Sequence, residues 1–223
     1  MDARSAQIGR NLAQVRERIA AACAAAGRSP DGVTLVAVTK TYPAQDVTRL
    51  AALGVHDVGE NRDQEAAPKA EEVADPAVRW HFVGQLQRNK ARSVVRYASA
   101  VHSVDSLRLV DALVDAAVKA ERPEPLDALV QVSLDDDEQR GGAVTGMVEQ
   151  VAAAIAASPA LRLRGVMDVA PLGMGLPSDP RIFVGGSPRS PGSDFVFGKR
   201  LPVRGLFQAG LEQSTWPRDS ALL

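Results

Sequence analysis

Lys40 is the residue of this chain whose type and position most directly suggest chemistry. It ends an apolar, β-branched run over residues 35–39 with turn-forming residues on both sides, which predicts a buried strand. Parallel α/β folds place their reactive groups at the carboxyl ends of such strands. A lysine there can lose its proton through desolvation and become an amine nucleophile that forms Schiff bases with aldehydes. The competing interpretation is a surface lysine just past a strand.

Three further residues stand at or near the ends of later apolar runs. Asn61 follows a predicted strand, whereas His81 and Met167 lie within two others. The carboxyl ends of parallel strands open on the same face, so these side chains are expected to converge with Lys40. From the residues alone, His81 also fits a hydrogen-bonded core histidine, and Met167 fits ordinary core.

Glu60, just before Asn61, has two interpretations of its own. A carboxylate at a strand end can serve as a catalytic acid. It can equally be the salt-bridge partner of a lysine such as Lys90, and the sequence leaves both alternatives open.

Periodic apolar residues predict an alternation of strands and helices up to about residue 172. Its short connections imply parallel βαβ units, which suit a (β/α)8 barrel or an open doubly wound sheet. No Gly-x-Gly-x-x-Gly follows the first strand, so a dinucleotide-binding sheet has no support. Pro68 should kink or split the helix in which it lies. The predicted strands are 35–39, 56–60, 79–84, 100–104, 126–134 and 163–170, and the predicted helices are 5–26, 43–53, 61–73, 86–97, 106–120 and 143–157.

Composition narrows the class of protein. The chain has 223 residues, of which 45% are hydrophobic and 24% charged, as in water-soluble globular domains. A formal net charge of −1 argues against nucleic acid or an anionic membrane as partner. Cys23 is the only cysteine, so we expect no intrachain disulfide and no cysteine-rich metal site. No signal-peptide or membrane-spanning pattern is found, which leads us to expect a cytoplasmic protein.

Five segments together resemble the pyridoxal phosphate (PLP) homeostasis family, a single-domain relative of the barrel domain of alanine racemase. Each segment alone is a modest signal, but their order and spacing over residues 5–172 are highly specific. The segments are VAVTK at 36–40, GENRDQE at 59–65, WHFVGQLQRNK at 80–90, HSVD at 102–105 and GVM at 165–167.

The resemblance implies a fold, a cofactor and a site. The fold is the (β/α)8 barrel of the alanine racemase N-terminal-domain type, here over residues 1–172. The cofactor is PLP, a form of vitamin B6, held as a Schiff base on Lys40, with Asn61, His81 and Met167 lining the same pocket. No residue is assigned a catalytic or metal-binding role. The implied partners are PLP and the PLP-dependent apo-enzymes that would receive it, and the implied assembly is a monomer or weak homodimer.

Residues 173–223 depart from that family. From residue 171 onward the chain holds 8 Gly and 7 Pro in 53 residues, against 10 Gly and 7 Pro in the preceding 170. Only 194–197 and 203–208 look strand-like, and the phosphate-binding loops expected after the seventh and eighth strands have no clear counterpart. A shifted reading frame or a disordered segment would produce such a composition. Without strands seven and eight the barrel keeps open edges, which the tail or a partner would have to cover.

Three functions remain open from the sequence. The first is a PLP-binding homeostasis protein without catalytic turnover. The second is a racemase-like PLP enzyme, which would need a further acid or base across the cofactor. The third is a remnant or scaffold that binds no cofactor because the phosphate loops are absent.

Overall fold

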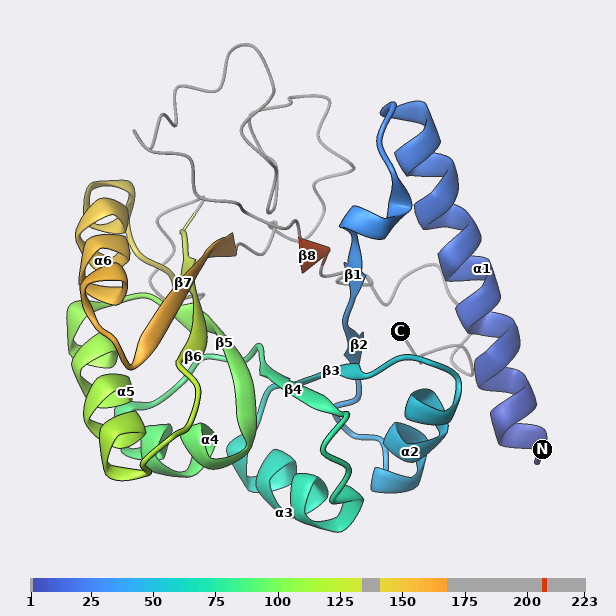
Figure 1. Ribbon diagram of the computed structural model, residues 1–223, viewed down its shortest axis with the longest axis horizontal. Helices are drawn as coiled ribbons and strands as arrows, with labels where there is room; N and C mark the ends of the chain where they lie inside the picture. The colour runs from blue at the N-terminus through green and yellow to red at the C-terminus, as the bar shows by residue number, and fades with distance from the viewer. Residues whose placement is uncertain (1, 134–140, 168–205, 208–223) are drawn as a thin grey trace. The chain divides into compact units, whose positions relative to one another are not determined.

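The computed structural model describes residues 2–133, 141–167 and 206–207, which are the coloured parts of Figure 1. The described chain divides into two compact units, the first ending at Phe82 and including 206–207, the second beginning at Val83. The predicted tail strand over 194–197 lies outside the described residues. The division into a barrel domain over 1–172 and a tail over 173–223 stays a prediction.

The first unit combines three helices with short parallel strands. Strand β2 pairs with β3, and β3 pairs with β4. The elements of this unit are α1 (Ala3–Ala25), the 3-10 helix η1 (Pro30–Gly32), β1 (Thr34–Leu35), β2 (Ala37–Val38), α2 (Ala44–Ala52), β3 (Asp57–Glu60), α3 (Asp63–Val73), β4 (Arg79–Phe82) and β8 (Leu206–Phe207).

The predicted strand over 35–39 is divided into β1 and β2. The two halves pair with different neighbours, since Thr34 pairs with Leu206 of β8 and Val38 with Gly59 of β3. Both pairings are parallel, as the strand–helix alternation predicts. Among the described strands, the half that precedes Lys40 is paired with β3.

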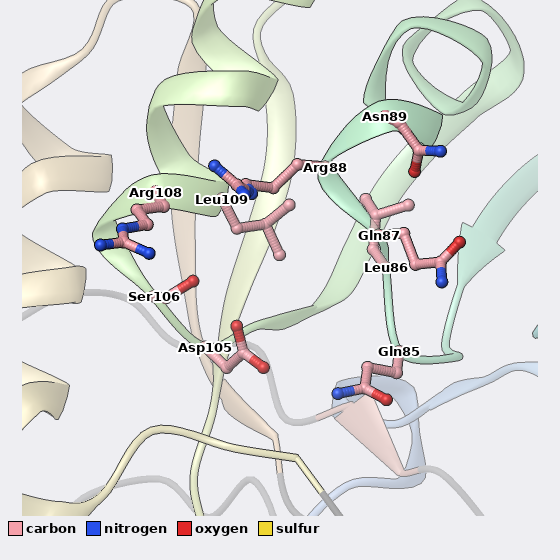
Figure 2. Close-up of a pocket in the computed structure, with 9 residues that line it drawn as sticks. All are labelled: Gln85, Leu86, Gln87, Arg88, Asn89, Asp105, Ser106, Arg108 and Leu109. Atoms are coloured by element: carbon pink, nitrogen blue, oxygen red, sulfur yellow. The ribbon is translucent and has the colours of Figure 1, made fainter.

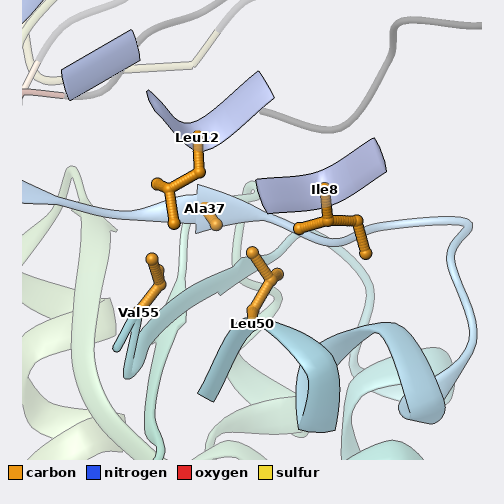
Figure 3. Packing of buried hydrophobic residues seen from close by; sticks show 5 residues of the cluster. All are labelled: Ile8, Leu12, Ala37, Leu50 and Val55. Carbon is orange, nitrogen blue, oxygen red and sulfur yellow. The ribbon is translucent and has the colours of Figure 1, made fainter. Parts of the chain in front are cut away.

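Helices α1 and α2 cover one face of β2. Ile8 and Leu12 lie one helical turn apart on α1, so both face the same way and bury their side chains against the strand. Figure 3 shows these side chains packed around a single small strand residue. The cluster consists of Ile8, Leu12, Ala37, Leu50 and Val55.

Helix α3 runs without interruption through Pro68, so the predicted split is wrong. Proline removes one backbone donor and leaves the carbonyl four residues earlier, that of Gln64, without its helical hydrogen bond. Pro68 and Gln64 are both exposed, so water can bond to that carbonyl. The helix then ends at Ala74, which adopts a left-handed conformation with φ of 46°.

The second unit is a three-stranded parallel arrangement covered by helices. Figure 1 shows α4, α5 and α6 on one side of β5, β6 and β7. The predicted helix over 86–97 is shorter than expected and begins with a 3-10 turn. The elements are η2 (Arg88–Lys90), α4 (Ala91–Tyr97), β5 (Ala98–Val104), α5 (Leu107–Lys119), β6 (Leu126–Gln131), α6 (Thr145–Ala157) and β7 (Leu161–Met167).

Strands β6 and β7 contain an irregularity that a sequence pattern does not reveal. Ala128 pairs with Leu163, but the next residue of β6 pairs with Gly165, so Arg164 is an extra residue in β7. Gly165 has φ of +141°, a conformation that side-chain-bearing residues rarely adopt. None of the described helices combines the length and apolar character that a membrane crossing requires.

Candidate functional site

Lys40 lies at the carboxyl end of β2, as predicted, and its side chain is exposed. The preceding residue, Thr39, is fully buried, and its N–H donates to the carbonyl of Gly59 at 2.8 Å. The following residue, Thr41, adopts a left-handed conformation with φ of +67°. The chain thus turns sharply at Lys40 and leaves its amine accessible to a solute at the edge of the strands.

Asn61 lies level with Lys40 by strand register. Val38 pairs with Gly59, and Lys40 and Asn61 each lie two residues further along the chain. Lys40 and Asn61 follow the last residues of β2 and β3, in a turn and a bend, and side-chain alternation continued past the strand ends would put both on the face of Val38 and Gly59. Gly59 contributes no side chain, and a Cβ added there would lie 3.3 Å from Val38 Cγ2. One level beneath, this face is formed by Val38, the backbone of Gly59 and the buried His81, which pairs with Gly59.

His81 shares that face, one level below, because it pairs with Gly59. Its side chain is buried, and Nε2 lies 2.8 Å from Asp57 Oδ1. Asp57 is nearer the amino ends of the strands, so the imidazole is bonded away from the end that carries Lys40. This is the hydrogen-bonded core histidine of the sequence analysis, and a contact between His81 and a cofactor stays a prediction.

Asp57 joins His81 to Arg79. Arg79 Nε donates to Asp57 Oδ1 at 2.8 Å, and a second guanidinium nitrogen of Arg79 contacts Oδ2. Burial alone would raise the pKa of Asp57, but the hydrogen bonds and positive charge of His81 and Arg79 outweigh it and hold that pKa below its usual value. Asp57 is thus an ionised anchor beneath the site.

A second polar cluster supports Lys40 from the opposite face of the strands. Glu60 Oε1 accepts from the Thr39 hydroxyl at 2.7 Å and from Lys69 Nζ at 2.6 Å. Lys69 Nζ also donates to the Thr39 carbonyl at 2.9 Å. Glu60 therefore has the salt bridge to a lysine that the sequence left open, and the described partner is Lys69. The cluster fixes the residue immediately before Lys40.

The Glu60 cluster is almost completely removed from water. The side chains of Glu60 and Lys69 are 1% and 9% exposed, respectively. Glu60 Oε2 is buried and has no hydrogen-bond partner among the described residues. Charges buried in this way are retained only when they are paired.

Met167 belongs to the second unit, where it ends β7. It is 3% exposed, pairs with Gln131 of β6, and its carbonyl accepts from the N–H of Val132 at 2.9 Å. The side chain is thus held in place at the carboxyl end of its strand, as predicted.

Sequence reasoning missed Asp57 and Lys69. Asp57 is an acidic residue inside a predicted strand, next to the apolar Val58, and that was the available signal. Lys69 carries no such signal, because a lysine on a polar helix is ordinarily solvated.

The sequence model of the family described as "alanine racemase, N-terminal domain" matches residues 10–173 of this chain, which is well over half of its length. The chain belongs to the alanine racemase N-terminal domain family. Its most similar curated relatives share the name pyridoxal phosphate homeostasis protein. The protein of Mycobacterium leprae is 44% identical over 76% of this chain and 72% of its own length, and that of Escherichia coli is 40% identical over 73% and 70%.

Solved structures agree with this family membership. PipY of Synechococcus elongatus with PLP bound is 33% identical, with a TM-score of 0.63 over 75% of this chain and 72% of its own. The alanine racemase of Streptomyces coelicolor is 22% identical, with a TM-score of 0.55 over 74% of this chain and 42% of that enzyme, and shows the shared fold alone. The α/β fold of parallel strands and the family predicted from the sequence are confirmed.

Proposed function

We propose that this protein binds PLP on Lys40 and serves cytoplasmic PLP homeostasis. The observation that carries the proposal is an accessible lysine amine at the carboxyl end of a parallel strand, level with Asn61. Relatives named for PLP homeostasis, at up to 44% identity, and a 33% identical structure that contains PLP support it.

The residues present fit such a cofactor. When bound, PLP supplies an aldehyde that forms a reversible covalent bond with an amine. Lys40 is exposed and offers that amine, and the buried Glu60 cluster holds the strand end that carries it. The Asn61 amide can orient the ring of the cofactor. Contacts of His81 and Met167 with the cofactor stay predictions of the family resemblance.

We further propose that the protein carries PLP without catalytic turnover. A racemase needs a second acid or base on the opposite face of the cofactor. Cysteine and tyrosine are side chains that could supply such a group, and neither Cys23 nor Tyr42 of the first unit is placed to do so. Cys23 is buried in α1, and Tyr42 packs against the α1–α2 core with the Arg4 guanidinium 5.7 Å from its ring centre. Exposure of Lys40 also suits a carrier, which must release its cofactor to an apo-enzyme.

A titration of the purified chain with PLP tests the binding proposal. We expect a visible absorption band that Lys40→Ala abolishes, and a borohydride-reduced adduct on the Lys40-containing peptide. Lys119→Ala is the matched control, because Lys119 is an exposed lysine of α5 whose only described partner is Asp115. A band of equal size in Lys40→Ala would contradict the site, and the absence of any band in folded protein would favour a chain that binds no cofactor.

A separate assay tests the absence of turnover. With PLP added, we expect no racemisation of L-alanine above the rate of PLP alone. A rate that depends on Lys40 and exceeds free PLP would make the protein a racemase-like enzyme.

A further inference from the structure

A groove in the second unit has no role in the proposed PLP site. It has a volume of about 700 Å³ and lies where η2 meets the first turn of α5. Its floor is apolar, because Leu86 and Leu109 are both buried, and Figure 2 shows them between the two walls. Small-molecule sites commonly combine such a volume with an apolar floor and a few polar groups.

Two arginines give this groove its charge. Figure 2 shows Arg88 extending from η2 toward the first turn of α5, which carries Arg108. Both side chains are exposed, and neither has a hydrogen bond or ion pair within the part of the chain that the structure describes. Some other arginines of this unit are engaged, since Arg162 binds Asp127 and Arg122 donates to the Val95 carbonyl, whereas the exposed Arg92 and Arg96 of α4 have no described partner either.

The other polar side chains that line the groove are the amides of Gln85, Gln87 and Asn89, the carboxyl group of Asp105 and the hydroxyl of Ser106. Ser106 precedes α5 without making a side-chain capping bond, and no acidic residue occupies the first turn of that helix. Asp105 is half-buried and adds one carboxylate beside the two guanidinium groups. The groove therefore offers two cations, one carboxylate, one hydroxyl and three amides.

We propose that this groove binds a small phosphate monoester with a compact apolar body. Guanidinium groups present paired donors that match phosphate oxygens, and two of them balance a dianion. Leu86 and Leu109 would contact the apolar body, and Asp105 would accept from a hydroxyl or amine of the ligand. With only two cations and one carboxylate, the groove lacks the extended positive surface that nucleic acid requires.

Phenyl phosphate is a suitable probe, because it has a phosphate and an apolar ring but no aldehyde with which to bond Lys40. Its affinity is measured by calorimetry at constant ionic strength. We expect Arg88→Gln and Arg108→Gln each to weaken binding about tenfold or more, the usual effect of losing one charge-assisted hydrogen bond. The control Arg96→Gln removes an exposed arginine of α4 outside the groove and should change affinity less than about twofold.

Three outcomes would overturn the proposal. The first is an affinity for phenyl phosphate that falls equally in Arg88→Gln, Arg108→Gln and the control Arg96→Gln, or that changes in none of them. The second is loss of phenyl phosphate binding in Lys40→Ala, which would assign the phosphate to the PLP site. The third is binding of a phosphoserine peptide without binding of phenyl phosphate, which would indicate a protein partner. The outcome does not depend on the PLP titration, because every arginine variant keeps Lys40.

Discussion

Replacing Lys69 by methionine should destabilise the protein strongly. The substitution leaves Glu60, 1% exposed, with the hydroxyl of Thr39 as its only described hydrogen-bond donor and without its described ion-pair partner. Removing one member of a buried ion pair typically costs about 3–5 kcal/mol, because the other charge stays in a low-dielectric environment. Domains of this size are stable by about 5–15 kcal/mol in total. We therefore expect Lys69→Met to lose a large part of the free energy of unfolding.

Urea unfolding followed by far-UV circular dichroism measures this effect, provided that the m-value stays unchanged. The double variant Glu60→Gln with Lys69→Met should recover most of the loss, because it no longer buries a charge. Lys119→Met is the matched control, since Lys119 and Asp115 are 58% and 57% exposed, and should cost less than about 1 kcal/mol.

The substitution should also affect function, because the strand end that carries Lys40 becomes less firmly positioned. Lys69 also donates to the Thr39 carbonyl, which immediately precedes Lys40. PLP should therefore bind Lys69→Met less tightly than the wild-type chain, even at temperatures where the variant is folded. A Lys69→Met variant within about 1 kcal/mol of the wild type would refute the view that this pair is buried and coupled.

Three further predictions concern other parts of the described chain. Gly142→Ala should lower the melting temperature, because φ is +111° and the new Cβ would lie 2.7 Å from a backbone nitrogen, whereas Gly146→Ala, with open space in α6, should be neutral or gain up to about 1 kcal/mol. Leu113→Ala removes a fully buried side chain and should cost about 2–5 kcal/mol in urea unfolding, against less than about 0.5 kcal/mol for Val118→Ala, which is 62% exposed. The lowered pKa of Asp57 stabilises the fold above the ordinary aspartate pKa, and this contribution is lost as pH falls through the lowered value. Asp57→Asn should therefore be less stable at neutral pH and show a weaker loss of stability on acidification, measured as the urea midpoint against pH.

The sequence predicted most secondary-structure elements because apolar periodicity is a local property. The long first helix and the parallel strands appear close to their predicted bounds. The errors arose where tertiary pairing overrides local pattern. Residues 35–39 look like one strand but divide in two, because their halves pair with different neighbours. Pro68 looks like a helix breaker, but Pro68 and Gln64 are both exposed, so the Gln64 carbonyl that loses its helical bond is open to water.

Some features of the candidate site could likewise be predicted from the sequence, whereas others required the tertiary structure. Lys40 at a strand end, with Asn61 at the next, could be read from the sequence, because strand ends and the side-chain alternation are encoded locally. Only the tertiary structure decided that Glu60 pairs with Lys69 and that His81 bonds to Asp57. These partners depend on strand register and on how α3 packs against the strands, and no spacing along the chain specifies either. The sequence specifies which side chains are charged, whereas the fold determines how deeply each is buried and which residue it pairs with.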